Sequence, residues 1–291
     1  MEIRRVQVEG PDRAYGLSYA DWGRPGTART VVCAHGLTRN GRDFDHLARV
    51  LAADRRVICP DVAGRGLSDP LTNPGDYALP TYVGHMLQLL QRLGLEEVDW
   101  VGTSMGGLLG MGLAAMGEAS PIRRLVLNDI GPFLPKAALE RINAYLGLDL
   151  RFWSLEALEA HLREIHAGFG PLTDAEWRHL AEHSAARRED GRFGLNYDQR
   201  LSQPMTTGPI ENIDLWPVWD QIHCPVLVVR GTESDLLLAG TAAEMTGRGP
   251  RAEVVEVDGT GHAPALMAKD QIEIVRAWLG RAEPAAAAQG R

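Results

Sequence analysis

Residues 98–107 of this sequence, Val-Asp-Trp-Val-Gly-Thr-Ser-Met-Gly-Gly, contain the pattern G-x-S-x-G with Ser104 at its centre. A short apolar segment precedes the pattern, and a helix is predicted to follow it at residues 107–116. A serine at such a sharp strand-to-helix turn has a strained backbone, and bulky residues two positions away would clash, which Gly102 and Gly106 avoid. The start of the helix also brings backbone N–H groups and the positive end of its dipole close to Ser104. The stretch therefore predicts a nucleophilic serine at the end of a buried strand.

Short apolar segments rich in β-branched residues recur on both sides of this turn. Such near-continuous hydrophobicity is typical of strands buried on both faces, as in a parallel sheet. The clearest segments are residues 30–34, 56–59, 98–101, 125–127, 226–229 and 253–257, and segments with helical periodicity lie between them at 44–53, 82–93 and 108–116. This alternation predicts an α/β fold, with a mostly parallel sheet flanked by helices. Residues 3–8 and 15–22 alternate more and predict an antiparallel edge.

The alternation of strands and helices stops after residue 127. Between residues 133 and 215 the sequence predicts helices and loops without a strand, and four of the seven Trp and four of the five Phe lie between 133 and 219. The aromatic content predicts an apolar underside, which would line a pocket or pack this segment onto the core. We therefore predict a first part of the core (1–132), an inserted helical cap (133–215), a second part of the core (216–281) and a flexible tail (282–291).

The composition limits the classes of partner. The 291 residues have a formal net charge of -8, which argues against a nucleic-acid or anionic-membrane surface. No stretch approaches the ~20 apolar residues of a membrane span, and residues 1–5 lack the apolar segment of a signal peptide. Cys33, Cys59 and Cys224 lack the spacing of a disulfide framework or a zinc site, which predicts reduced thiols and a cytoplasmic protein. The oligomeric state is left undecided.

Further motifs resemble those of the α/β-hydrolase fold family over nearly the whole chain. His35-Gly36-Leu37, after the predicted strand 30–34, is similar to the H-G-x oxyanion loop of that family. The resemblance implies that the backbone N–H groups of Leu37 and Met105 form an oxyanion hole, and that His35 shapes the loop. Residues 61–68, Asp-Val-Ala-Gly-Arg-Gly-Leu-Ser, resemble the D-x-x-G-x-G-x-S stretch of the family, which implies a turn beside the site.

A serine hydroxyl becomes a good nucleophile when a positioned base takes its proton. His262 lies on a glycine-rich loop after the last predicted strand, and a histidine can accept and return a proton near neutral pH. The acid that orients the histidine is expected after the strand 226–229, where Asp235 fits the G-x-x-x-D spacing of the family. Glu233 is the second candidate, and Asp129 after the preceding strand is the third. The order Ser104, Asp235, His262 is the one expected for this fold.

These residues predict a serine carboxylic-ester hydrolase that forms an acyl-enzyme and needs neither a metal nor an organic cofactor. The expected partner is a small-molecule ester. Enol-lactone hydrolysis stays open on the same triad, as does carbon–carbon bond hydrolysis, although the loop after His35 and Ala263 depart from what that subgroup usually carries. Arg39 is expected either to bind a substrate carboxylate or to form a surface ion pair. The non-enzyme alternative is a small-ligand receptor on the same fold.

One motif lies outside this scheme. His179-Leu180-Ala181-Glu182-His183 matches H-x-x-E-H, the pattern of an inverted zinc peptidase site. On a helix the two histidines, four residues apart, share one face, as metal ligands must. The segment is rich in charge, however, and no pattern places a third ligand, so the sequence favours a solvated helix of the cap.

Overall fold

A computed structural model describes residues 1–24, 26–27, 29–206 and 208–282 of the chain. Its centre is an eight-stranded sheet with the order β1-β2-β4-β3-β5-β6-β11-β12. The strands are β1 (Glu2–Glu9), β2 (Ala14–Trp22), β3 (Thr30–Ala34), β4 (Arg56–Pro60), β5 (Val98–Thr103), β6 (Ile122–Asn128), β11 (Val226–Gly231) and β12 (Glu253–Val257). Six neighbouring strands of the sheet pair in parallel, namely β4, β3, β5, β6, β11 and β12. Strands β1 and β2 form the antiparallel edge. The predicted α/β class and the mostly parallel sheet are confirmed.

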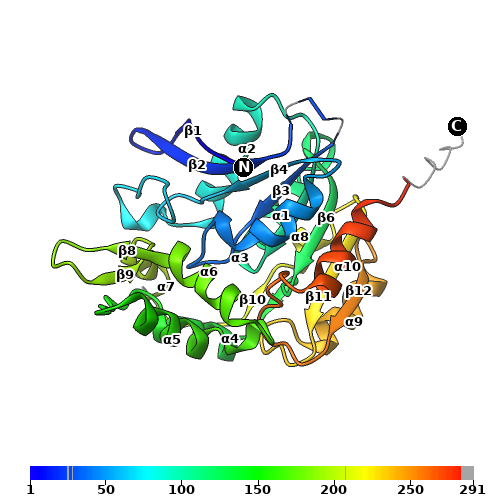
Figure 1. Ribbon diagram of the computed structural model, residues 1–291. Helices are drawn as coiled ribbons and strands as arrows, with labels where there is room; N and C mark the ends of the chain where they lie inside the picture. Colours follow the sequence, from blue (N-terminus) through cyan, green and yellow to red (C-terminus); the bar gives the residue numbers. More distant parts are fainter. Residues whose placement is uncertain (25, 28, 207, 283–291) are drawn as a thin grey trace, which may run out of the picture.

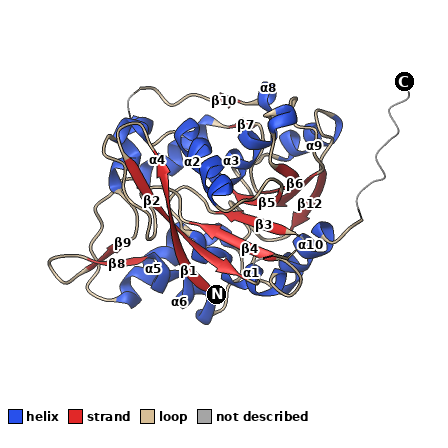
Figure 2. Ribbon diagram, turned by 90° about the horizontal axis from the view of Figure 1, so that it is seen from above, coloured by secondary structure: helices blue, strands red, loops and turns tan. Residues whose placement is uncertain are grey.

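Helices cover both faces of this sheet (Figure 2). One face carries α2 (Leu79–Arg92), α3 (Met105–Ala114), α8 (Trp216–Trp219) and α9 (Ala239–Gly247), and the other carries α1 (Asp45–Leu51) and α10 (Lys269–Leu279). Along β3, Val32 and Ala34 pack into the apolar cluster on the face of α2 and α3, while Val31 and Cys33 pack into the cluster on the face of α1 and α10. Because successive side chains of a strand point to opposite faces, a strand covered on both sides must be apolar throughout.

Short helical turns complete the core. They are η1 (Gly41–Phe44), η2 (Pro74–Asp76) and η3 (Gly117–Ala119). The first of them matters for the site, since η1 leads from the loop after β3 directly into α1.

The segment predicted as a cap lies between β6 and α8, and Figure 1 shows its helices α4, α5 and α6 gathered at one end of the sheet. It contains α4 (Lys136–Tyr145), α5 (Leu155–Ile165), η4 (Ala167–Phe169), α6 (Asp174–Ser184), η5 (Gln199–Ser202) and α7 (Gln203–Thr206). It also contains two antiparallel pairs, β7 (Phe133–Leu134) with β10 (Ile213–Asp214) and β8 (Ala185–Arg187) with β9 (Phe193–Leu195). The prediction of a segment without strands was wrong, because strands of two or three residues are too short to show a period-two pattern.

The cap has its own apolar cluster. Leu158, Leu162, Trp177 and Leu180 pack there together with Met267 of the core, and Phe152, Phe169 and Phe193 border it. The aromatic content of the cap therefore serves in part to pack it onto the core. Residues 283–291, which make up most of the predicted tail, lie outside the described residues.

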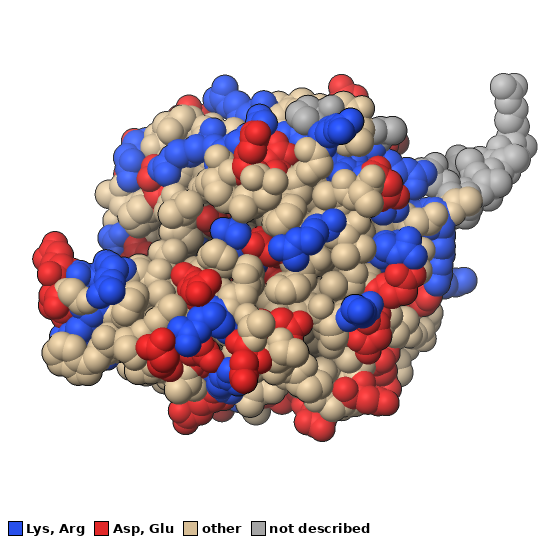
Figure 3. Space-filling model, viewed as in Figure 1, with Lys and Arg blue, Asp and Glu red and all other residues tan. Residues whose placement is uncertain are grey.

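The surface mixes both signs of charge. On the face shown in Figure 3, Lys and Arg side chains lie next to Asp and Glu side chains over most of the described chain. The exposed ion pairs of the molecule include Arg276–Glu273 and Arg248–Asp220. Among the helices of the described ranges, none has the length and apolar character that crossing a membrane requires.

Candidate active site

Ser104 lies at the turn between β5 and α3. Its backbone has φ 52° and ψ −118°, outside the regions that L-residues ordinarily adopt. Its N–H donates to the Asn128 carbonyl (3.1 Å), and its carbonyl accepts from Gly107 N–H (2.8 Å). These bonds hold the serine in the strained conformation that the G-x-S-x-G pattern requires.

The two glycines of the pattern lie against backbone. A Cβ on Gly106 would lie 1.9 Å from the carbonyl oxygen of Ala34, and a Cβ on Gly102 would lie 2.3 Å from the carbonyl carbon of Gly106. Neither neighbour is the end of a flexible side chain, so neither can move aside. The turn therefore brings the start of α3 as close to the end of β3 as backbone atoms allow.

Gly106→Ala is expected to lower the free energy of unfolding by about 3 kcal/mol or more, the upper end of what overpacking costs. The measurement is urea unfolding followed by circular dichroism. Gly84→Ala is the matched control, because a Cβ on Gly84 of α2 meets nothing within 4 Å. That control should gain up to about 1 kcal/mol from helix propensity. Equal unfolding free energies for the two variants would contradict the packing argument.

His262 connects Ser104 to a carboxylate. Its Nε2 lies 2.9 Å from Ser104 Oγ, and its Nδ1 lies 2.8 Å from Asp129 Oδ2. The side chain of His262 is 12% exposed and that of Asp129 is fully buried. Asn128 ties the loop of His262 to the sheet, since its Nδ2 donates to Thr103 Oγ1 (3.0 Å) and to the Pro264 carbonyl (2.8 Å). A hydroxyl, an imidazole and a carboxylate thus lie in hydrogen-bonded series.

Asp129 follows β6 directly and is held by three donors. Besides His262, the N–H of Gly231 donates to Oδ1 (2.9 Å) and the hydroxyl of Ser234 donates to Oδ2 (2.6 Å). The backbone of Asp129 has φ 55°, in the left-handed region where Asp and Asn are enriched among non-glycine residues. A buried carboxylate needs such partners, because each lone pair left without one costs free energy.

The prediction that Asp235 orients His262 is corrected by this geometry. Asp235 forms a bidentate ion pair with Arg141 of α4 (2.5 and 2.8 Å), and its side chain is 48% exposed. Glu233, the second candidate, is also exposed. In the loop after β11, it is Ser234 that turns inward, toward Asp129, and Asp235 turns outward. The loop that was expected to supply the acid therefore supplies the Ser234 hydroxyl, which donates a hydrogen bond to Asp129. The carboxylate that contacts His262 is that of Asp129, the third candidate.

The predicted oxyanion loop runs beside the serine. A Cβ on Gly36 would lie 3.7 Å from Ser104 Cβ, which places Leu37 next to the turn. Met105 is the first residue of α3, and the N–H of a first helical residue has no partner within its helix. Behind both lies the fully buried Arg65, whose Nε donates to the Leu37 carbonyl (2.9 Å) and whose Nη2 lies 3.6 Å from Met105 Sδ. A buried guanidinium therefore lies beside the predicted oxyanion loop.

His35 holds this loop through both ring nitrogens. Val62 N–H donates to its Nε2 (3.0 Å), and its Nδ1 donates to the Gly36 carbonyl (2.7 Å). Burial lowers the pKa of His35 to about 4, so the ring is neutral. Asp61 fixes the far end of the loop by accepting from Gly41 N–H (2.8 Å). The stretch 61–68 thus acts as a brace for the loop 35–41.

Arg39 is an ion-paired residue of the same loop. Its Nε and Nη2 lie 2.8 and 2.7 Å from the Asp43 carboxylate, and its side chain is only 6% exposed. Of the two expected roles, the ion pair is present, but it is buried rather than on the surface. The Asp43 carboxylate thus holds the Nε and Nη2 side of the Arg39 guanidinium.

The cap lies on the loop of His262. Gly261 N–H donates to the carbonyl of Gly168 in η4 (2.8 Å). The adjoining His166 is buried and stacks on Phe169 at 4.5 Å between ring centroids, and burial holds its pKa well below the ordinary range. The predicted cap thus lies against the backbone of His262, with the stacked rings of His166 and Phe169 next to this contact.

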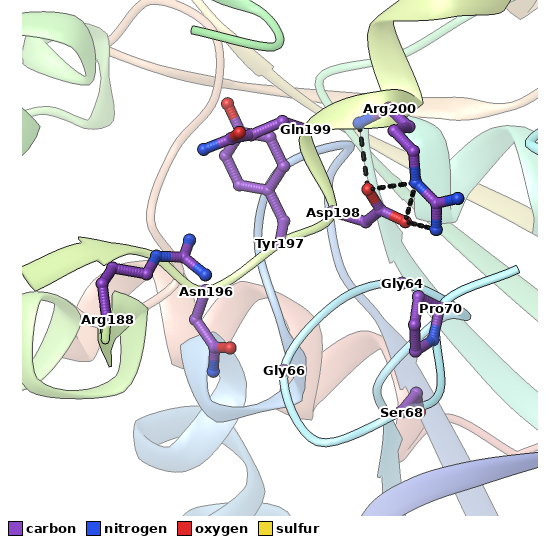
Figure 4. A pocket seen from close by; sticks show the side chains of 10 residues that line it. All are labelled: Gly64, Gly66, Ser68, Pro70, Arg188, Asn196, Tyr197, Asp198, Gln199 and Arg200. Carbon is purple, nitrogen blue, oxygen red and sulfur yellow. Dashed lines mark hydrogen bonds and ion pairs between the residues drawn. The ribbon is translucent and has the colours of Figure 1, made fainter. Parts of the chain in front are cut away.

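A separate hollow of about 560 Å³ lies between the core loop 64–70 and the cap segment 188–200 (Figure 4). Asp198 and Arg200 form an ion pair on its wall (2.6 Å). None of Ser104, Asp129 and His262 lines it, so the reaction is not placed there.

Comparison with known proteins agrees with the geometry. The model of the Alpha/beta hydrolase family matches residues 31–274. The chain belongs to this family. It is 48% identical over 277 residues to the 3-hydroxybutyrate-oligomer hydrolase of Cupriavidus necator, covering 92% of this chain and 94% of the relative. It is 28% identical over 239 residues to the 2-(acetamidomethylene)succinate hydrolase of Mesorhizobium japonicum, covering 81% and 82%.

A solved structure gives the same relationship. An alpha/beta hydrolase from Novosphingobium aromaticivorans superposes with a TM-score of 0.86 at 35% identity, over 97% of this chain and 99% of that one. Within the family, the relative with 48% identity is a hydrolase of esters, and this chain is accordingly a carboxylic ester hydrolase.

Proposed function

We propose that the chain hydrolyses the ester bonds of short 3-hydroxybutyrate oligomers, with Ser104 as nucleophile, His262 as base and Asp129 as orienting acid. The observation that carries the substrate class is the 48% identity to a 3-hydroxybutyrate-oligomer hydrolase along nearly the whole chain. The hydrogen-bonded series from Ser104 through His262 to Asp129 supports the chemistry. The three free cysteines support a cytoplasmic enzyme, because thiols persist in that compartment.

Acylation follows from the contacts of the serine. His262 Nε2 takes the proton of Ser104 Oγ as the oxygen attacks the ester carbonyl, and Asp129 stabilises the imidazolium through Nδ1. The carbonyl oxygen becomes an oxyanion that the N–H groups of Leu37 and Met105 bind. His262 then gives the proton to the leaving alkoxide, which is the hydroxyl oxygen of the next 3-hydroxybutyrate unit. The products of this step are an acyl-enzyme and a shortened oligomer with a free hydroxyl.

Deacylation repeats the same steps with water. His262 takes a proton from water as its oxygen attacks the acyl carbonyl, and returns that proton to Ser104 Oγ as the acyl bond breaks. The product leaves as a carboxylic acid, which releases its remaining proton to the solvent. Arg65 supports the oxyanion of each step indirectly, since its guanidinium contacts the Leu37 carbonyl and Met105 Sδ.

The test measures monomer released from the dimer, trimer and tetramer of 3-hydroxybutyrate, next to p-nitrophenyl esters from acetate to decanoate. We expect release of monomer from the oligomers and labelling by a fluorophosphonate probe. Hydrolysis of p-nitrophenyl esters without release from any oligomer would overturn the substrate class and leave the esterase. Labelling without hydrolysis of either kind of ester would favour enol-lactones or carbon–carbon substrates. Neither labelling nor hydrolysis would favour a receptor.

A further inference from the structure

Three potential metal ligands gather where the cap helix α6 meets the core helix α1. They are Asp45, His179 and His183, and their ligand atoms all lie within 4.8 Å of one another. His179 Nε2 is already 3.6 Å from Asp45 Oδ2. Two atoms bound to zinc at about 2.0–2.1 Å in a tetrahedral site lie about 3.3 Å apart. The three ligand atoms are therefore close to the separation that one shared ion requires.

The structure supplies what the sequence did not show at the H-x-x-E-H motif. The third ligand, Asp45, lies more than 130 residues away and contacts the motif only in the folded chain. The face is also not solvated, since the side chain of Asp45 is 3% exposed and that of His179 is 19% exposed. The rings of His179 and His183 meet edge to face at 4.5 Å, and His46 lies 5.3 Å from His179. His179 is thus packed between two other imidazole rings.

We propose that Asp45, His179 and His183 bind one divalent cation of the zinc class, with water completing the coordination. Two imidazoles and one carboxylate suit Zn²⁺, Co²⁺ and Ni²⁺ better than Mg²⁺ or Ca²⁺, which prefer oxygen ligands alone. The ion ties the cap to the core, because two ligands come from α6 and the third from α1. Close by, Asn40 Nδ2 donates to the His183 carbonyl (2.9 Å), so the tie reaches the end of the oxyanion loop.

Arg42 competes with the ion. Its Nε and Nη2 bind the Asp45 carboxylate at 3.0 and 2.5 Å, and its carbonyl oxygen lies 3.0 Å from His179 Nε2. The cation must displace the guanidinium from Asp45 and the proton of His179 Nε2 from that carbonyl. Arg42 therefore weakens binding, and removing its charge is expected to strengthen it. A gain of affinity on losing Arg42 is a result that misfolding cannot imitate.

The experiment titrates the full chain, freed of metal with a chelator, with Co²⁺ and then Zn²⁺. Binding is measured by the visible absorption of Co²⁺ and by calorimetry. We expect one ion per chain, the absorption bands of four-coordinate Co²⁺, and a rise in Tm. His183→Gln should weaken binding at least about tenfold, and Arg42→Gln should strengthen it. His223→Gln is the control, because His223 is exposed and lies outside the cluster, and it should bind as the unmodified chain does.

Two outcomes would overturn the proposal. One is unmodified protein that binds no more tightly than His183→Gln, and the other is loss of binding in His223→Gln. Folding of each variant is checked by its turnover of p-nitrophenyl butyrate without metal, which should stay within about twofold of the unmodified chain because the cluster takes no part in the ester chemistry. The metal titration does not depend on the oligomer proposal, so either can fail alone.

Discussion

Ser104→Ala is expected to lower kcat for ester hydrolysis by about 10⁶, which is the loss found when the nucleophile of a hydrogen-bonded triad is removed. The reason lies in the geometry of the elbow. Ser104 Oγ is 2.9 Å from His262 Nε2, and its backbone is held in a strained conformation next to the start of α3. An alanine leaves the oxyanion donors in place but removes the atom that forms the acyl bond. The measurement is kcat for p-nitrophenyl butyrate together with fluorophosphonate labelling.

Ser120→Ala is the matched control for this variant. Ser120 is a partly exposed serine whose hydroxyl accepts from Ile122 N–H (3.1 Å), with no contact to the triad. It should label and turn over ester as the unmodified chain does. If Ser104→Ala kept its label or more than about a thousandth of its activity, another residue would have to be the nucleophile.

Asp129→Asn is expected to lower kcat by about 10⁴, since an amide cannot stabilise the imidazolium and favours the wrong tautomer of the histidine. Asparagine is the right substitution here. It tolerates the left-handed backbone of residue 129, where φ is 55°, and it has the shape of aspartate. The fold should therefore persist while the chemistry fails. The measurement is again kcat for p-nitrophenyl butyrate, with the melting curve as a check on folding.

Asp235→Asn tests whether the acid is Asp129, as the geometry indicates, or Asp235, as the spacing of the family predicts. Its carboxylate pairs with Arg141 at the surface, where a single ion pair stabilises by about 1 kcal/mol or less. We expect kcat within about threefold of the unmodified chain. Should Asp235→Asn lose about 10⁴ and Asp129→Asn keep its activity, the acid would be the one that the sequence favoured, and the described arrangement of the loop after β11 would not be the active one.

The assignment of the acid shows where sequence reasoning ended. Ser104 and His262 were predicted as nucleophile and base from local patterns, because each lies in a turn that contains glycines. The acid has no such signature. Asp235 matches the G-x-x-x-D spacing, and the only local sign of Asp129 was its place at the end of β6, where catalytic groups of parallel sheets gather. Which carboxylate contacts His262 depends on whether the side chain of residue 234 or that of residue 235 turns inward.

By itself, the sequence determined the α/β class, the two-sided burial of the strands, the antiparallel edge and the strained serine. Each of these follows from the chemistry of neighbouring residues: runs of β-branched side chains, helical periodicity, and glycines where a Cβ would meet backbone. Only the tertiary structure decided which carboxylate lies against His262 and which lies against His179. The pairs Asp129–His262 and Asp45–His179 join residues more than 130 positions apart. Such contacts depend on how strands and helices pack in three dimensions, and no spacing along the chain records that.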